Sequence, residues 1–281
     1  MKHALGIDLG GTELRVALVE ETGGILSQCS TKTAAGDGPA AVLEQMRLLI
    51  AETLHERKHI RLEGIGVGSP GPLDTCAGIV IRAANLRNWI NVPLRQMISD
   101  MTGLRTELNN DGNAGALGEF HFGSGQGYRN IVYVSIGTGI GGGVIVDGRL
   151  LLGRKGMAAE IGHMSISMDG PVCGCGNVGC WEALASGRAM AEMAQYSSQE
   201  QSRLEQEARY LGIGITNLLH LFSPECVILG GGVAQLFDQL IGTIQETTNQ
   251  RAMPAYRDVP IVPAKLGKNA GLVGAASLIL R

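Results

Sequence analysis

The chain has 281 residues, a formal net charge of −3 and only 17% charged side chains. This balance excludes the strongly basic surface that holds a nucleic-acid backbone, so we expect no nucleic-acid partner. No apolar run approaches the roughly 20 residues of a membrane-spanning helix, and the first residues lack both a charged n-region and a cleavage site. We therefore expect a cytoplasmic protein that does not associate with membranes.

The N-terminal segment predicts a strand pair. Two apolar runs, Leu5 to Leu9 and Leu14 to Val19, are joined through Gly10-Gly11-Thr12, and Ile25 to Thr33 continues the sheet. Apolar side chains then recur at helical spacing from Val42 to about Arg57. Strands at 62–67 and 105–108 alternate with helices at 92–102 and 112–120, which is typical of a layered α/β fold.

The same pattern starts again at Ile131. The runs Ile131 to Ile136 and Gly143 to Val146 predict a second strand pair around a glycine-rich turn, which indicates an internal repeat. Helices at 186–222, 235–248 and 271–280 follow, with strands at 227–229 and 261–263. We divide the chain into an N-terminal α/β lobe, residues 1–109, and a larger C-terminal α/β lobe, residues 110–269. We expect the closing helix, residues 270–281, to pack back on the first lobe.

The glycine-rich turn of the second pair has the spacing of a dinucleotide-binding loop. That loop must run from a strand into a helix, however, and the residues after Gly142 re-enter a sheet. An ordinary P-loop is excluded as well, because no Walker lysine follows either turn. Either turn alone is more often structural than functional.

Two such turns, each with a threonine hydroxyl, could hold the phosphates of a nucleotide through converging backbone N–H groups. The predicted phosphate-binding residues are Gly10, Gly11 and Thr12 in the first turn and Gly137, Thr138 and Gly139 in the second. Asp8 precedes the first turn and could bind Mg²⁺ directly or through water, with turn capping as the alternative. Gly231 and Gly232 form a third loop, which could approach an adenosine.

Four candidate metal ligands lie close together in the sequence, between residues 163 and 180. His163, Cys173, Cys175 and Cys180 supply the four ligands of one tetrahedral zinc shell. Such a shell has no open position for water, so we predict a structural zinc ion rather than a catalytic one. The alternative is a set of buried thiols around a core histidine. The other three cysteines lie singly in apolar surroundings, which favours packing.

Polar side chains around these motifs suit a sugar. Glu160 and Glu182 flank the zinc cluster, so the metal would fix both carboxylates, although either could be an ordinary surface group. Asp111 opens a small-residue helix, where it could cap the helix or act as the base that takes a hydroxyl proton. Asn110 and Asn85 carry amides that both donate and accept hydrogen bonds.

These motifs together resemble the ROK family of repressors, open reading frames and sugar kinases. The resemblance spans essentially the whole chain and includes Asp8 to Thr12, Gly68 to Pro72, Asn110 to Ala114, Gly137 to Gly143, Glu160 to His163, Cys173 to Glu182 and Gly230 to Gly232. It implies a two-lobed, actin-like ATPase fold of the ribonuclease H-like class with duplicated β-hairpin phosphate loops. It also implies transfer of the γ-phosphate of ATP, with Mg²⁺, to the C6 hydroxyl of a hexose, usually by a homodimer.

Carried over residue by residue, the resemblance makes Asp111 the catalytic base. It makes Gly71, Asn85, Asn110, Glu160, His163 and Glu182 sugar contacts. His163 would then serve twice, with one ring nitrogen on zinc and the other on a sugar hydroxyl. Two positions depart from the family pattern: Ala159 replaces an expected glycine, and segment 187–211 is shorter than usual.

We expect a glucokinase-like hexose kinase that acts on glucose. The alternatives are a kinase for N-acetylmannosamine or for another hexose or amino sugar, and a sugar-sensing protein without kinase activity. The repressor branch carries an added N-terminal DNA-binding domain, whereas this chain starts at the first strand, so we expect an enzyme.

Overall fold

The computed structural model describes residues 1–83, 85–193 and 200–281 and divides into two compact units. The first unit comprises Met1–Gly123, Leu151–Ala158 and Asn269–Arg281, and the second comprises Ser124–Leu150 and Ala159–Lys268. The expected boundary at residue 109 differs from this division. The residues after 109 form helix α3 (Asp111–Phe122), which packs on the C-terminal helix α8 (Ala270–Leu280) inside the first unit.

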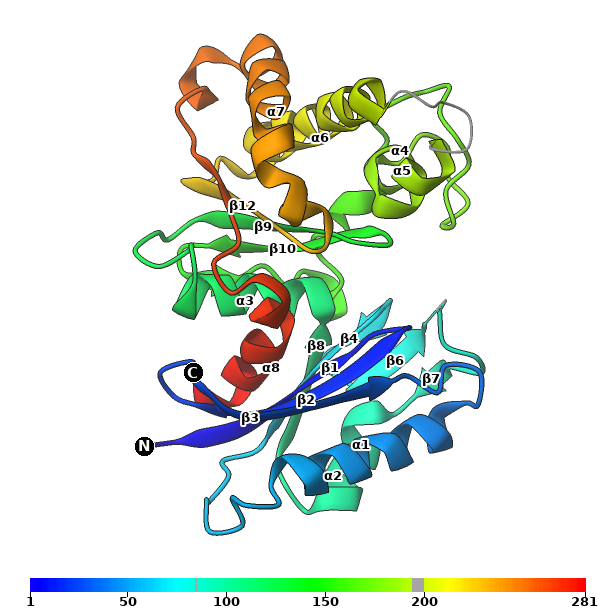
Figure 1. Ribbon diagram of the computed structural model, residues 1–281, viewed down its shortest axis with the longest axis vertical. Helices are drawn as coiled ribbons and strands as arrows, with labels where there is room; N and C mark the ends of the chain where they lie inside the picture. Colours follow the sequence, from blue (N-terminus) through cyan, green and yellow to red (C-terminus); the bar gives the residue numbers. More distant parts are fainter. Residues whose placement is uncertain (84, 194–199) are drawn as a thin grey trace. The chain divides into compact units, whose positions relative to one another are not determined.

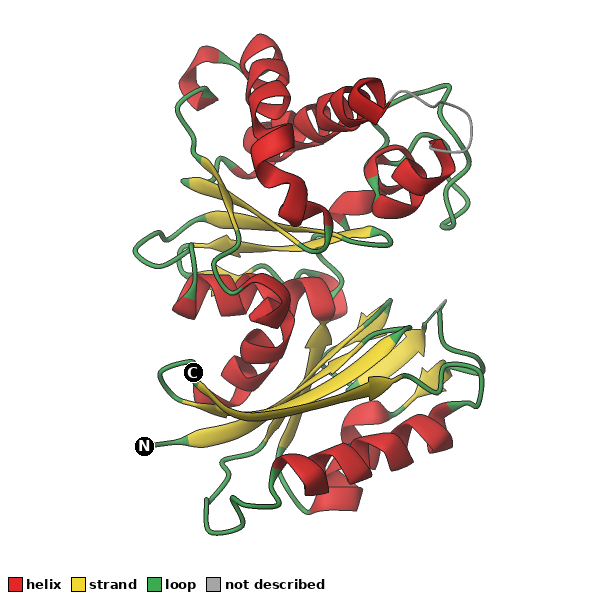
Figure 2. Ribbon diagram, in the orientation of Figure 1, coloured by secondary structure: helices red, strands yellow, loops and turns green. Residues whose placement is uncertain are grey.

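The first unit is built on a five-stranded sheet with helices on both faces (Figures 1 and 2). Its strand order is β3 (Ile25–Lys32), β2 (Glu13–Glu20), β1 (His3–Leu9), β4 (Ile65–Ser69) and β8 (Thr106–Asn110). Strands β1, β4 and β8 are parallel, and β2 runs antiparallel to β1. Helices α1 (Pro39–Thr53) and α2 (Leu94–Thr102) cover one face, and α3 and α8 cover the other.

Helix α8 lies unusually close to the sheet and to α3. A Cβ atom at Gly66 would lie 1.7 Å from the Ala275 carbonyl oxygen, and one at Gly274 would lie 1.6 Å from the Ala114 carbonyl oxygen. Only glycine leaves room for backbone at these distances. The N-terminal end of α8 thereby reaches Asp8, because a Cβ atom at Gly271 would lie 3.4 Å from the Asp8 Oδ2 atom.

A small sheet in the first unit was not predicted. Strands β5 (Leu73–Asp74), β6 (Ile79–Arg82) and β7 (Ile90–Val92) form a three-stranded antiparallel sheet. These strands are too short to show an alternating apolar pattern, and turn residues separate them.

The second unit repeats the strand order of the first. Its sheet runs β11 (Arg149–Leu150), β10 (Ile140–Val146), β9 (Ile131–Ile136), β12 (Cys226–Gly230) and β13 (Ile261–Pro263). As in the first unit, the hairpin strands are antiparallel, and the next two strands continue parallel to the central one. The predicted repeat is therefore present as a repeat of topology. Strand β10 begins at Ile140 rather than Gly143, because Ile140 pairs with Ile136.

Helices of very different lengths complete the second unit: α4 (Trp181–Ala185), α5 (Gly187–Met193), α6 (Glu200–Phe222) and α7 (Phe237–Arg251). The long α6 packs along α7 and also touches α4 and α5. Residues 194–199 of the short segment noted at 187–211 lie outside the described residues. Of the helices that the structure describes, none is long and apolar enough to cross a membrane.

Candidate active site and metal centre

The predicted acidic residues of the first unit lie at one edge of its sheet. Asp8 pairs with Gly68 of the neighbouring strand, and Ser69 pairs with Asn110 of the strand beyond. Because β1, β4 and β8 are parallel, their carboxyl ends meet at this edge, where open α/β sheets bind their ligands. Asp8, the turn that contains Gly71, and Asp111 are thus brought together by topology.

Asp111 is the first residue of α3. The Asn110 side chain caps this helix, with its Oδ1 accepting a hydrogen bond from the Gly112 N–H at 2.8 Å. The Asp111 Oδ1 accepts from the same N–H, also at 2.8 Å. The positive end of the helix dipole favours an ionised carboxylate here. The capping alternative for Asp111 therefore has support, because its Oδ1 shares the Gly112 N–H with the Asn110 cap. The role of Asp111 as the base stays a prediction.

Arg15 forms an ion pair with Asp8 that the sequence analysis missed. The two residues face each other across the β1–β2 hairpin, and the guanidinium Nη2 donates to the Asp8 Oδ2. Both side chains are more than four-fifths buried, with 14% and 17% exposed. Such a pair fixes the carboxylate's direction. Counting the hairpin register from its glycine turn would have revealed it.

Two further predicted residues of the first unit lie beside other predicted site residues. A Cβ atom at Gly11 would lie 2.7 Å from the Asn85 Cβ atom, so the phosphate turn touches the exposed Asn85. A Cβ atom at Gly71 would lie 3.3 Å from the Asn110 Nδ2 atom. The predicted sugar and phosphate residues of this unit therefore form one group.

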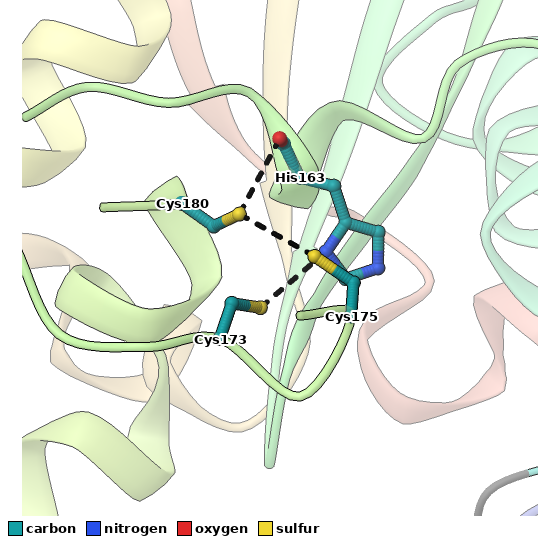
Figure 3. Close-up of side chains that lie close together, drawn as sticks. All are labelled: His163, Cys173, Cys175 and Cys180. Atoms are coloured by element: carbon teal, nitrogen blue, oxygen red, sulfur yellow. Dashed lines mark hydrogen bonds between the residues drawn. The ribbon is translucent and has the colours of Figure 1, made fainter. Parts of the chain in front are cut away.

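The four predicted metal ligands come together in the second unit, in the segment before α4. The ligand atoms of His163, Cys173, Cys175 and Cys180 all lie within 4.8 Å of one another (Figure 3). The Cys175 and Cys180 sulfurs are 3.6 Å apart, and the Cys173 sulfur is 3.6 Å from the His163 Nδ1. A tetrahedron with Zn–S bonds of about 2.3 Å requires sulfurs about 3.8 Å apart. The donor set and its spacing therefore fit zinc.

The thiols of this cluster differ in their tendency to ionise. Burial, and then its neighbour Cys175, raise the pKa of Cys180 to about 12. A hydrogen bond from the Asn177 backbone N–H lowers the pKa of the exposed Cys175. Metal ligation requires thiolates, so a divalent cation would have to displace the Cys180 proton. Zinc binding should accordingly release protons.

The residues next to the metal centre carry the predicted sugar contacts of this unit. The His163 Nδ1 faces the sulfurs, which directs the Nε2 to the other side of the ring (Figure 3). Loss of hydration raises the pKa of Glu160; the nearby His163 acts against this shift, and Glu182 adds to it. The Glu182 Oε2 accepts a hydrogen bond from the Ile140 N–H at 2.9 Å. That last contact was not predicted.

The glycine turn of the second unit lies beside the third glycine loop. Gly231 has a φ of +82°, and a Cβ atom there would lie 2.4 Å from the Ile136 carbonyl oxygen. The Gly187 N–H donates to the Gly137 carbonyl at 2.8 Å. Gly137, Gly139 and Gly231 thus gather where β9 and β12 end, and the exposed Thr138 lies at the tip of the turn.

Comparison with known proteins identifies the family. The family model described as "ROK family" matches residues 4–281. The chain belongs to the ROK family. A ROK relative, the glucokinase of Thermotoga maritima, is 36% identical over 309 aligned residues, which cover 98% of this chain and 96% of the relative.

Solved ROK structures share the fold. A ROK glucokinase from Streptomyces griseus, in complex with glucose and AMPPNP, superposes with a TM-score of 0.86 at 30% identity, covering 99% of both chains. A ROK transcriptional regulator, a homologue of the E. coli MLC protein, superposes with a TM-score of 0.88 at 29% identity, covering 99% of this chain and 77% of the regulator. The predicted actin-like ATPase fold is confirmed.

Proposed function

We propose that this ROK protein transfers the γ-phosphate of ATP to the C6 hydroxyl of glucose. The coarser assignment, a sugar kinase, has direct support from its glucokinase relatives. The observation that carries phosphoryl transfer is the position of Asp111, which opens α3 at the sheet edge where Asp8 also lies. Glucose as the acceptor is supported by the glucokinase relatives. In that arrangement Asp111 supplies a base for the acceptor hydroxyl, and Asp8 supplies a carboxylate for the Mg²⁺ that accompanies the phosphates.

In this mechanism Asp111 orients the sugar hydroxyl and takes its proton as the oxygen bonds to the γ-phosphorus. The bond between that phosphorus and the bridging oxygen breaks in the same step, and ADP leaves. Asp8 would hold Mg²⁺ directly or through water, with its carboxylate oriented by Arg15. When bound, Mg²⁺ neutralises charge on the transferred phosphoryl group. The backbone N–H groups of the turns at 10–12 and 137–139 hold the phosphates, and the loop at Gly231 and Gly232 accommodates the adenosine.

The sugar hydroxyls would be held by amides and carboxylates that donate and accept in defined directions. We assign this work to Gly71, Asn85 and Asn110 in the first unit and to Glu160, His163 and Glu182 in the second. When bound to His163 and the three cysteines, zinc braces the segment that carries the last three residues. A homodimer is also expected from the family, and light scattering of the purified protein would measure it.

Exchange of Asp111 for asparagine tests the assignment. Asp111→Asn should lower kcat by about a thousandfold, because general bases contribute about 10² to 10⁴. Glucose binding measured by calorimetry should change little, since the amide keeps the shape of the carboxylate. Asp100→Asn, an exposed exchange of the same type in α2, should leave kcat unchanged. Near-normal turnover by Asp111→Asn would refute the proposed base.

A sugar sensor is the second candidate, because the superposition with the transcriptional regulator is as good as that with the kinase. Coupled ADP release over glucose, mannose, allose, fructose and N-acetylated sugars separates the two. A kinase turns over at least one sugar, and the order of kcat/KM values gives its specificity. Sugar binding without ADP release from any sugar would favour the sensor. A preference for N-acetylmannosamine would replace glucose as the substrate.

A further inference from the structure

We propose that Glu182 is a positioning residue for the nucleotide, tying the metal centre to the phosphate-binding turn at 137–139. This inference rests on the proposed function, because it takes that turn as the nucleotide site. It gives the zinc centre a second effect, on ATP affinity, in addition to the expected effect on sugar affinity.

The contact between Glu182 and the turn is short and leaves no spare room. The Glu182 Oε2 accepts the Ile140 N–H at 2.9 Å, and a Cβ atom at Gly139 would lie 2.2 Å from the same oxygen. Ile140 is buried and pairs with Ile136 across the hairpin, so it is the first residue after the turn to have a fixed place. A charge-assisted hydrogen bond at this point restrains the backbone on which the turn is built.

Glu182 also lies beside the predicted metal ligands. Cys180 is the N-cap of α4, and Glu182 is the second residue of that helix. The Glu182 Oε1 lies 4.0 Å from the Cys173 sulfur. The next residue along from Cys180, Trp181, is fully buried, and its backbone N–H donates to the Met164 carbonyl at 2.8 Å. Metal ligation by Cys180 would therefore fix the place from which Glu182 reaches the turn.

Two more contacts hold the same turn to segments beside the metal ligands. A Cβ atom at Gly162, which precedes His163, would lie 2.0 Å from the Ile140 carbonyl oxygen. On the other side, the Gly187 N–H bonds the Gly137 carbonyl at 2.8 Å. A turn that is already ordered loses less conformational freedom when a ligand binds, so affinity rises. The effect should thus appear in the dissociation constant of the nucleotide rather than in kcat.

The experiment is calorimetric titration of MgAMPPNP into zinc-loaded protein, without sugar and with saturating glucose. Glu182→Met removes the acceptor and keeps the approximate shape, and it should weaken nucleotide binding about tenfold, the usual effect of losing a hydrogen bond to a charged group. Glu182→Gln keeps an acceptor oxygen and should weaken it only about threefold. Gly139→Ala, which collides with the same carboxylate from the turn side, should reproduce the loss seen with Glu182→Met.

Glu160→Gln is the matched control. Glu160 is the other predicted sugar carboxylate, but the carboxylate that accepts the Ile140 N–H is that of Glu182. Glu160→Gln should therefore weaken glucose binding and leave MgAMPPNP binding within about twofold of the wild type. Hydrogen exchange provides a readout that does not depend on catalysis. The Ile140 amide should exchange faster in Glu182→Met and in the metal-ligand variant Cys175→Ser than in the wild type. Zinc content and thermal unfolding establish that the Glu182 variants are folded and loaded.

The outcomes are distinct. If MgAMPPNP affinity and the hydrogen-exchange rate of the Ile140 amide are both normal in Glu182→Met, the inference is overturned. Glu182 would then be a sugar contact alone. Tighter nucleotide binding by Glu182→Gln would overturn it too, because repulsion between carboxylate and phosphate would then outweigh positioning. If the wild type binds MgAMPPNP neither without sugar nor with saturating glucose, the proposed kinase function would instead be refuted. If Glu182→Met does not fold, hydrogen exchange of the Ile140 amide in Glu182→Gln and Cys175→Ser decides, and rates equal to those of the wild type would overturn the inference.

Discussion

The two units share a strand order and differ in what is inserted at the carboxyl ends of their strands. In the first unit the small sheet β5–β7 follows β4, and the edge is supplied with Asp8 and Asp111. In the second unit the segment with the four predicted metal ligands leads into α4. Glu182 of this helix contacts the corresponding end of the sheet at Ile140. One framework thus carries two kinds of chemistry, because loops at a strand end can change while the sheet stays the same.

The largest stability difference should come from comparing two buried cysteines of the second unit. Cys180→Ser removes a metal ligand and should lower the free energy of unfolding by about 4 kcal/mol, because structural zinc contributes directly to folding. Cys226→Ser, in β12, removes no predicted metal ligand and places a hydroxyl in a fully buried site, which should cost about 1 to 2 kcal/mol. Zinc analysis and urea unfolding would measure both. Equal losses, with zinc retained by Cys180→Ser, would show that Cys180 is not a zinc ligand, and a wild type without zinc would contradict the metal centre.

Two glycine exchanges would sharpen the comparison of helices between the units. Gly274→Ala in α8 places a Cβ atom 1.6 Å from the Ala114 carbonyl oxygen and should destabilise by about 3 kcal/mol. Gly242→Ala in α7 meets no atom of the described residues within 4 Å outside its own stretch of helix and should stabilise by about 0.5 to 1 kcal/mol. Chemical unfolding gives both values. Similar effects from the two exchanges would show that α8 can move away from α3.

A smaller, pH-dependent effect concerns a buried glutamate of α6. Glu207 is fully buried, and among the described residues neither carboxylate oxygen has a hydrogen-bond partner. Desolvation raises its pKa from 4.5 to about 8, so its folded form holds a proton that the unfolded chain has released. Stability from this group is therefore complete below pH 4.5 and is lost as the pH rises through about 8.

Glu207→Gln removes this dependence. At pH 8 the variant should be more stable than the wild type by about 2 kcal/mol, and the difference should shrink towards pH 5. Glu205→Gln, an exposed exchange on the same helix in an ion pair with Arg209, should change stability by less than about 0.5 kcal/mol at either pH. Urea unfolding at both pH values measures the effect. A constant difference would indicate that Glu207 stays in one protonation state.

Local patterns were enough to predict the two hairpins and the metal cluster. The hairpins have alternating apolar runs around glycine, and the four ligands of the cluster lie within one short segment. Contacts that depend on pairing between distant segments were missed. The bond between Glu182 and Ile140 joins residues 42 positions apart, and the pair of Asp8 with Arg15 depends on strand register. Glu207 resembles an ordinary surface glutamate until the packing of α6 is known.

The place of α8 has a consequence for biosynthesis. β1 and β4 are made early, yet α8, the helix that covers them, is made only after the whole second unit. Until then the apolar face under α8 has no cover from its own chain, whereas the strands and helices of the second unit are all made before α8. Domains usually fold in order of synthesis. Here we expect the reverse, with the N-terminal half completing its core after the C-terminal half.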